Sequence, residues 1–165
     1  MSIAEAMVME FTHESAGTRK MLERLPDDKL AWKPHQRSMS MGRLGMHLAE
    51  IPWWAQTIVK DESFDMASFD RKRVEPDNKK EILDKFDGNV QSFQELLKGQ
   101  SDEHLFQHWK LTESGHVAVD MPRLVCLRGF VLSHIIHHRG QLSVYLRLND
   151  VPLPALYGPS ADENM

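Results

Sequence analysis

The chain has 165 residues, 41% of them hydrophobic and 27% charged, a composition close to that of an ordinary globular protein and unlike a disordered, collagen-like or coiled-coil chain. Its net charge of -4 disfavours a protein that binds nucleic acid through the phosphate backbone. The start shows no signal-peptide pattern, and no apolar run approaches the roughly 20 residues of a membrane span, so we expect one cytoplasmic domain over residues 1–165 that contacts no membrane.

Two helices are predicted in the first sixty residues. Apolar residues at helical spacing predict a first helix over 3–25, which Pro26 ends. The stretch 30–39 is expected to be a connecting loop. Ser40 is a suitable N-cap for a second helix, which runs to about Lys60.

A third helix is predicted after the charged, aperiodic segment 61–76, which we expect to be a surface loop. Asp77 or Asn78 can cap this helix, which runs through about Lys98 and ends at Gly99. Its apolar residues recur at helical spacing, so the helix has one side that can pack on a core.

The last third of the chain combines a hairpin signal with a long helix. Residues 101–120 change periodicity, and apolar residues on both sides of the Glu-Ser-Gly at 113–115 favour a short β-hairpin. Pro122 suits the first turn of a final helix that runs to about Leu148. Four long amphipathic segments predict an all-α fold, a four-helix bundle with the hairpin between its third and fourth helices.

The final helix carries two histidines that can face one ion. His134 and His138 lie about 40° apart around the helix and about 6 Å apart along it. Apolar residues such as Leu127 and Val131 share their stripe, which predicts that this stripe faces the interior and that Arg139 points away. Nine histidines in a chain of this length give about half of one such pair by chance, so the pair alone is weak support for a metal site.

His47 supplies a third candidate ligand. It lies in an apolar run with Leu44 and Leu48, where a neutral imidazole without a partner would be costly to bury. Ligation of a metal ion or a hydrogen bond would offset that cost. Because metal sites with an open coordination position commonly use three protein ligands, we predict a divalent ion on His47, His134 and His138.

Other residues are weaker candidates for the same site. Glu50 is a candidate ligand or base, although a solvated or supporting role is favoured. Gln141 is a candidate for orienting water or substrate, with core packing as the alternative. His13 and Tyr145 are further pocket candidates, and no catalytic base is assigned. The four tryptophans either line a pocket mouth or belong to the core and its rim: Trp32, Trp53, Trp54 and Trp109.

Several other chemistries are disfavoured. A second histidine pair, His104 and His108, sits among polar residues and is expected to be an exposed turn. Cys126, the only cysteine, excludes an internal disulfide and zinc modules with two thiolates, and we expect it to be an inert buried thiol. The chain has no HExxH, GxSxG, P-loop or GxGxxG motif, and it lacks the carboxylate and histidine set of a di-iron bundle.

The closing segment of the chain resembles that of the DinB/YfiT-like family. Residues 134–160 read HIIHHRGQLSVYLRLNDVPLPALYGPS, in which the family's HxxxHRGQ core precedes a Leu-Arg pair, a short turn, a proline and Tyr-Gly. The matching positions are His134, His138, Arg139, Gly140, Gln141, Leu146, Arg147, Pro154, Tyr157 and Gly158. Upstream, MGRLGMHLAEIPWW resembles the family's second-helix segment and supplies His47.

This resemblance implies a four-helix bundle of unusual helix order, commonly a homodimer, whose three histidines bind nickel or zinc, with iron or manganese as alternatives. Some members of the family transfer low-molecular-weight thiols, so it also implies a metal-dependent enzyme that acts on a small-molecule thiol, as a transferase or a hydrolase. One alternative is a metal-stabilised stress-response or scaffold protein without turnover. A metal-free interaction module is a third hypothesis, which elemental analysis would separate from the other two.

Overall fold

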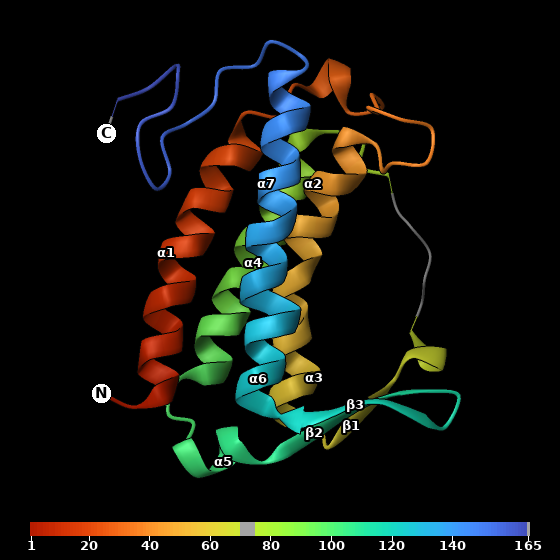
Figure 1. Ribbon diagram of the computed structural model, residues 1–165, viewed down its shortest axis with the longest axis vertical. Coiled ribbons are helices and arrows are strands. Elements are labelled where there is room, and N and C mark those ends of the chain that lie inside the picture. The colour runs from red at the N-terminus through yellow and green to blue at the C-terminus, as the bar shows by residue number, and fades with distance from the viewer. Residues whose placement is uncertain (70–74, 165) are drawn as a thin grey trace.

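The computed structural model describes residues 1–69 and 75–164. Figure 1 shows long helical segments running side by side along the longest axis of the molecule, with a small sheet across one end. The predicted predominance of helix is confirmed, although the sheet makes the all-α class too narrow. No described helix is long and apolar enough to cross a membrane.

Helix α1 comprises Ile3–Glu23, close to its predicted bounds. A capping box begins it: the Ser2 hydroxyl accepts a hydrogen bond from the Glu5 backbone N–H, and the Glu5 carboxylate accepts one from the Ser2 N–H. On its buried side, Phe11 stacks on Phe93 with ring centroids 3.8 Å apart, which joins α1 to the third long helix.

The second predicted helix is present but divided. Helix α2 spans Met41–Glu50, the 3₁₀ turn η2 spans Ile51–Trp53, and α3 spans Trp54–Lys60. The predicted cap is confirmed, because the Ser40 hydroxyl accepts a hydrogen bond from the Arg43 N–H at 3.0 Å. The proline in η2 has no backbone N–H, so the chain passes from α2 to α3 through a tighter turn.

Helix α4 spans Lys79–Leu97 and packs against α1 and α2. Of the two predicted caps, Asn78 serves, since its side-chain oxygen accepts a hydrogen bond from the Glu81 N–H at 3.1 Å. Gly99 follows the helix with a φ of 80°, a conformation that glycine adopts without strain. The prediction for this helix is therefore confirmed at both ends.

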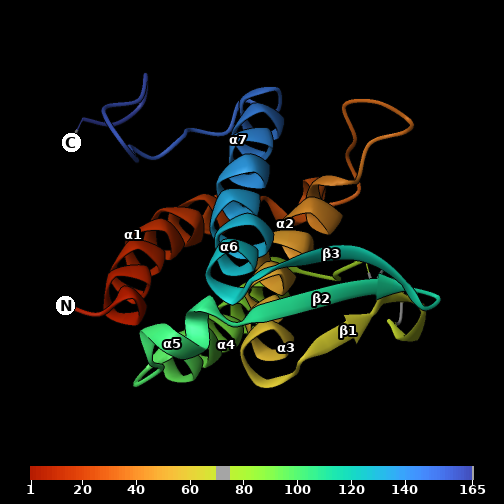
Figure 2. The same cartoon turned by 60° about the horizontal axis from the view of Figure 1, so that its bottom comes forward.

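The small sheet has the strand order β1-β2-β3, seen side by side in Figure 2. Strands β2, His108–Glu113, and β3, His116–Pro122, form the predicted antiparallel hairpin. Ser114 and Gly115 make its turn, both at positive φ. Strand β1, Ser63–Asp65, lies parallel to β2 and adds a third strand that the sequence pattern does not reveal.

Strand β1 corrects the prediction that 61–76 is a loop. The 3₁₀ turn η3, Met66–Ser68, follows the strand. Residues 70–74 of the predicted loop lie outside the described part of the chain. Helix α5, Asp102–Phe106, leads from α4 into β2. A strand of three residues is too short to show a recognisable alternation of polar and apolar residues. In addition, its pairing with β2 depends on residues that are distant in the sequence.

The last helical segment runs from the sheet to the opposite end of the molecule and follows Pro122, as predicted. Helix α6 spans Arg123–Leu127, η4 spans Arg128–Ser133 as a π-helix, and α7 spans His134–Arg147. The C-terminal tail then passes over the end of α1 (Figure 1).

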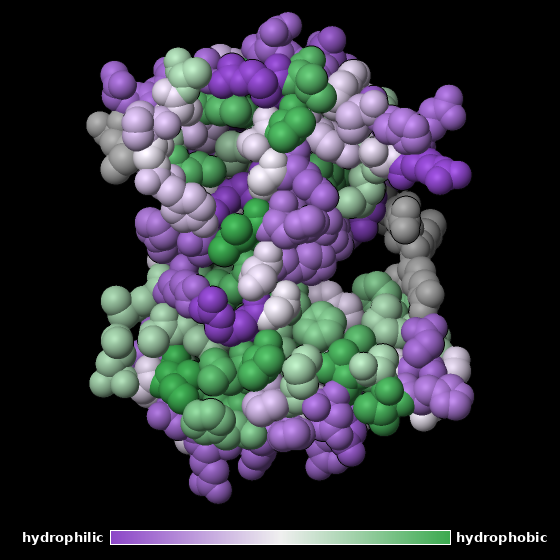
Figure 3. Space-filling view, viewed as in Figure 1, coloured by the Kyte–Doolittle hydropathy of each residue, from purple (hydrophilic) through white to green (hydrophobic). Residues whose placement is uncertain are grey.

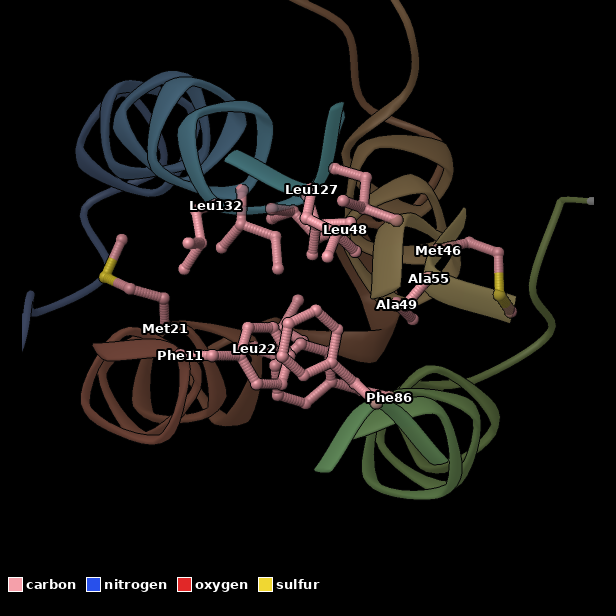
Figure 4. Close-up of a cluster of buried hydrophobic side chains, with 14 of the residues drawn as sticks. Phe11, Met21, Leu22, Met46, Leu48, Ala49, Ala55, Phe86, Leu127 and Leu132 are labelled. Carbon is pink, nitrogen blue, oxygen red and sulfur yellow. The ribbon is translucent and has the colours of Figure 1, made fainter. Parts of the chain in front are cut away.

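The core lies where the long helices meet. Its central side chains are almost fully buried and come from four helices: Phe11, Leu22, Leu48, Phe86 and Leu127 (Figure 4). Burying a side chain of this size stabilises a fold by about 1.5–3 kcal/mol relative to leaving it in water. Helix α2 packs directly on α7 in this arrangement, so the side chains that the two helices present to each other have defined positions.

Candidate metal centre

Three histidines from α2 and α7 converge on one point. His47 lies in the second half of α2, and His134 and His138 occupy successive turns of α7. The Nε2 atoms of His47 and His134 are 3.3 Å apart, and those of His134 and His138 are 2.9 Å apart. The structure thus brings together the three residues that the sequence predicts as metal ligands.

These separations suit a single ion. Zinc–imidazole bonds are about 2.0–2.1 Å long, so two nitrogens on one tetrahedral ion lie about 3.3–3.4 Å apart. One ligand nitrogen from each ring lies within 4.8 Å of the others, and all three rings are half-buried. No fourth histidine, cysteine or carboxylate joins this cluster in the described part of the chain, so an ion held there would keep open coordination positions.

Hydrogen bonds determine which nitrogen of each α7 histidine faces the cluster. His138 donates from Nδ1 to the Gln141 side-chain oxygen at 2.7 Å. His134 donates from Nδ1 to the Phe130 carbonyl at 3.3 Å. A neutral imidazole that donates from Nδ1 carries its lone pair on Nε2. Two lone pairs therefore face each other across 2.9 Å, an arrangement that a cation between them would stabilise.

Burial keeps these two histidines in the neutral form that binds metal. Desolvation lowers the pKa of His134, and repulsion from His138 lowers it further despite the bond to Phe130. Desolvation also lowers the pKa of His138, although its bond to Gln141 acts in the opposite direction. Both rings are therefore uncharged near neutral pH, the state that a metal ligand needs.

The π-helix η4 ends directly before His134 and shapes its surroundings. The backbone N–H of His134 bonds to the Val131 carbonyl, while the Phe130 carbonyl accepts the bond from the His134 ring. Short π-helical turns inside α-helices are rare and occur often at functional sites. The sequence pattern gives no sign of this irregularity, because one helical period covers the whole segment.

The predicted orientation of α7 needs a correction. Its most buried face carries Arg139 among aliphatic residues, whereas the two histidines lie beside it at the junction with α2. Arg139 is only 3% exposed. It donates to the Glu14 carboxylate at 2.6 Å and to the Tyr157 hydroxyl, and this pairing makes its burial tolerable. Arg139 does point away from the histidines, but into the interior.

A cleft of about 740 Å³ opens beside the cluster and has His47 and His134 in its wall. Its volume is in the range of small-molecule sites. Four aromatic residues from η2, α3, η4 and the segment after η3 form much of the remaining wall: Trp53, Trp54, Phe69 and Phe130. Two of the three candidate ligands therefore border a space that a small molecule can enter.

Glu50 and Gln141 have supporting positions. Glu50 lines the cleft, but its carboxylate accepts a hydrogen bond from Arg43 Nη2 at 2.8 Å and does not belong to the ligand cluster. Gln141 is exposed, so the alternative of core packing is wrong. Its contact is with His138, whose ring it holds, and it lies outside the lining of the cleft.

The remaining histidine and tyrosine candidates lie elsewhere. His13 is exposed on α1, with its ring 6.5 Å from that of Tyr157, and it does not border the cleft. The Tyr145 hydroxyl donates to a backbone carbonyl at the entry of α2. His104 and His108 form no pair, because α5 ends between them. His104 is half-buried against the end of α3, and His108 pairs with an aspartate of β3.

The tryptophans and the cysteine divide between cleft and core. Trp53 and Trp54 line the cleft, as one of the two predictions had it, whereas Trp109 is fully buried and Trp32 packs edge-on against a tyrosine of α7. Cys126 is buried, and desolvation raises the pKa of its thiol. A thiol with a raised pKa is a poor nucleophile, which agrees with its predicted inert role.

Two charged residues of the cleft, Arg43 and Lys85, are absent from the sequence predictions. Arg43 precedes His47 by four residues and therefore shares its side of α2, a spacing that could have identified it. Lys85 comes from α4, and no local pattern connects it to the histidines.

Together, the fold and the cluster define a helical protein with a candidate metal centre between two of its long helices. The model of the DinB family matches residues 1–164, and the chain belongs to that family.

Individual relatives agree with this assignment. The chain is 28% identical to the uncharacterized protein YrdA of Bacillus subtilis (strain 168) over 151 residues, 91% of this chain and 85% of YrdA. A DinB-like protein from Bacillus cereus ATCC 10987 has a TM-score of 0.70 at 22% identity and covers 93% of this chain and 97% of its own. The DinB-like protein YjoA of Bacillus subtilis has the same TM-score and identity and covers 92% and 97%. At this identity, the two structures show the shared fold alone.

Proposed function

We propose that this DinB protein is a four-helix bundle that binds one divalent metal ion on His47, His134 and His138, and that it is a metal-dependent enzyme that transfers a low-molecular-weight thiol. The observation that carries the metal site is the convergence of Nε2 lone pairs on rings held through Nδ1. Zinc or nickel suits imidazole donors better than manganese, which prefers oxygen ligands, and iron is the remaining alternative.

The ligands and the cleft have separate roles in this proposal. A divalent ion on the three nitrogens would lower the pKa of a thiol or water beside it and so provide a nucleophile near neutral pH. Gln141 and the Phe130 carbonyl hold the α7 rings with Nε2 inward, and the aromatic wall gives the space beside His47 an apolar surface. In the transfer, the thiolate sulfur bonds to an electrophilic carbon, whose leaving group departs with its electron pair, and the thiol proton passes to solvent.

Elemental analysis tests the metal site. Protein purified without a histidine tag should contain about one equivalent of zinc or nickel, and His134→Ala should contain much less, because two imidazoles bind an ion weakly. The matched control is His13→Ala, an exposed histidine outside the cluster, which should keep full occupancy. Metal content that is absent from the wild type, or unchanged in His134→Ala, would contradict the proposed site.

Thiol transfer is tested on protein of known metal content. We expect consumption of at least one of several low-molecular-weight thiols with 1-chloro-2,4-dinitrobenzene, and loss of this turnover after chelation. Turnover that survives chelation would exclude the metal-dependent mechanism. Full metal occupancy without any turnover, combined with unfolding after chelation, would favour the metal-stabilised scaffold instead.

A further inference from the structure

Arg43 lines the cleft and carries two buried hydrogen-bond donors that have no partner among the described residues. It lies four residues before His47, so the two side chains share one side of α2 and are about 6 Å apart along the helix. The Arg43 side chain is 11% exposed. Its Nη2 donates to Glu50, but Nε and Nη1 are buried and have no hydrogen-bond partner in the part of the chain that the structure describes. A buried N–H group without a partner keeps its full desolvation cost, which an incoming acceptor would relieve.

The charged side chains around the cleft balance one another, and a bound metal ion would make their sum positive. Among the described residues that line it, two are cationic, Arg43 and Lys85, and two are acidic, Glu50 and Glu113, so their formal charges cancel. Glu50 is already engaged by Arg43. An ion bound on the histidines of the wall would make the cleft net positive. Low-dielectric walls concentrate such a field and attract ligands of opposite charge.

An apolar wall lies within the same cleft. The rings of Trp54 and Phe130 have centroids 5.6 Å apart, and that of Phe69 lies 5.9 Å from Trp54 and 5.7 Å from Trp53. These contacts make a continuous aromatic surface beside the candidate ligands. A cleft with one large apolar surface and a few polar groups selects molecules that carry both kinds of surface.

We propose that the cleft recognises an organic carboxylate: its carboxylate binds Arg43, Lys85 adds attraction at the mouth, and its apolar body lies against Trp54 and Phe130. This inference rests on the proposed function, because it names the substrate class of the same site. A carboxylate suits Arg43 because a charged oxygen accepts a stronger hydrogen bond from a guanidinium than a neutral oxygen does. Bound in this way, the ligand extends along α2 toward His47.

Calorimetric titration with two matched probes tests the proposal. The zinc-loaded protein should bind 2-naphthoate at least about tenfold more tightly than the neutral alcohol 2-naphthylmethanol, as expected for a hydrogen bond to a charged group. Arg43→Gln should remove most of this preference. Lys85→Gln alters an exposed residue and should weaken only the naphthoate, by about two- to threefold. Equal affinities for the two probes in the folded wild type would overturn the proposal.

A control variant and a metal-free arm separate this inference from the metal site. Arg128→Gln removes an arginine that pairs with Glu10 outside the cleft, so its affinities should match those of the wild type. The effect of Arg43→Gln should persist in metal-free protein, even if the chain holds no ion at all. Naphthoate binding that requires zinc and ignores Arg43→Gln would place the carboxylate on the ion and overturn the role of Arg43. Equal affinities for the two probes in zinc-loaded protein would refute carboxylate recognition by the cleft without contradicting the proposed metal site.

Discussion

Gln141 holds the ring of His138 through its side-chain oxygen and is itself exposed, so its contribution to the candidate site can be separated from folding. In Gln141→Leu the ring loses the acceptor that fixes its tautomer, and we expect metal affinity to fall about 10- to 100-fold. Competition with a chromogenic chelator measures this affinity. Gln141→Glu keeps an oxygen acceptor and should restore most of it. An unchanged affinity in Gln141→Leu would show that the ring is held by other contacts.

At this scale, the sequence predicts residues whose role follows from spacing on one helix. The pair His134 and His138 is an example, and His47 was added because an imidazole within an apolar run needs a partner. Arg139 was misjudged because the residue that pairs with it, Glu14, is 125 positions away and no local pattern connects them. Gln141 was noticed, but its contact with a ring three residues earlier depends on side-chain conformations that spacing does not specify.

Close packing of α2 depends on Gly45. A Cβ added there would lie 2.8 Å from Leu25 Cδ1 and 3.2 Å from Ile82 Cδ1. Gly45→Ala should therefore cost about 1–3 kcal/mol of unfolding free energy in urea. It should also weaken metal binding, since α2 carries His47. Gly88→Ala is the matched control on α4, where no atom lies within 4 Å, and it should stabilise the protein by up to about 1 kcal/mol. Equal effects of the two changes would contradict the described packing.

Two helices and the C-terminal tail meet at the Glu14 carboxylate, which accepts bonds from Arg139 and Tyr157. Burial alone raises the pKa of Glu14, but these hydrogen bonds outweigh it, so the pKa is lowered from its ordinary value. The folded state therefore binds this proton less readily than the unfolded chain does. The stability it contributes is complete above the unfolded pKa, about 4.3, and is lost as the pH falls through the lowered folded pKa.

Tyr157→Phe removes one of these bonds and should lower the unfolding free energy by about 1 kcal/mol at neutral pH. The deficit should shrink once acid has protonated Glu14 in both proteins, because the carboxylate that the hydroxyl stabilises is then absent. Urea titrations at neutral and acidic pH measure both values. A deficit that stays constant with pH would mean that the hydroxyl acts through its bond from Arg139 and not through the Glu14 carboxylate.

Local sequence was enough to identify the helix caps. It was not enough to identify structure that depends on pairing with distant residues. Ser40 and Asn78 were identified because an N-cap is determined by the few residues around it. Strand β1 was missed because it exists only by pairing with β2, which lies more than forty positions later. The π-helix η4 was missed because a regular apolar period does not distinguish it from an α-helix.

Apolar side chains are exposed along the outer side of the last helical segment. Val125, Ile136 and Val144 are exposed there. Figure 3, viewed as in Figure 1, shows hydrophobic residues gathered on the face toward the viewer, mainly in its lower half. Apart from the backbone of its own helix and its chain neighbours, a Cβ added at Gly129 or Gly140 would meet no described atom within 4 Å. Glycine inside a helix costs stability, and nothing in the described packing requires it at these two positions. Close approach of a second helix would account for both glycines, so we propose this face as the interface of the homodimer that the family resemblance implies.

Size-exclusion chromatography with light scattering tests this assembly. The wild type should have twice the mass of one chain, and Val144→Glu should have the mass of one, because a charge cannot be buried unpaired in an apolar interface. Val117→Glu, on β3 and equally exposed, is the matched control and should remain dimeric. A wild type of single mass would exclude the dimer, and a monomeric Val117→Glu would place the interface at the sheet.

His47 and His134 are 87 positions apart, so an ion bound to both would close a long loop. Loop closure in an unfolded chain has an entropic cost that rises with the logarithm of loop length, so the two ligands should meet only after α2 has docked on α7. Capture at so late a stage would stabilise the native state far more than the folding transition state. The ion should then slow unfolding and leave the folding rate nearly unchanged. In a cell short of metal, the chain would still fold at its usual speed, and its lifetime in the folded state would shorten.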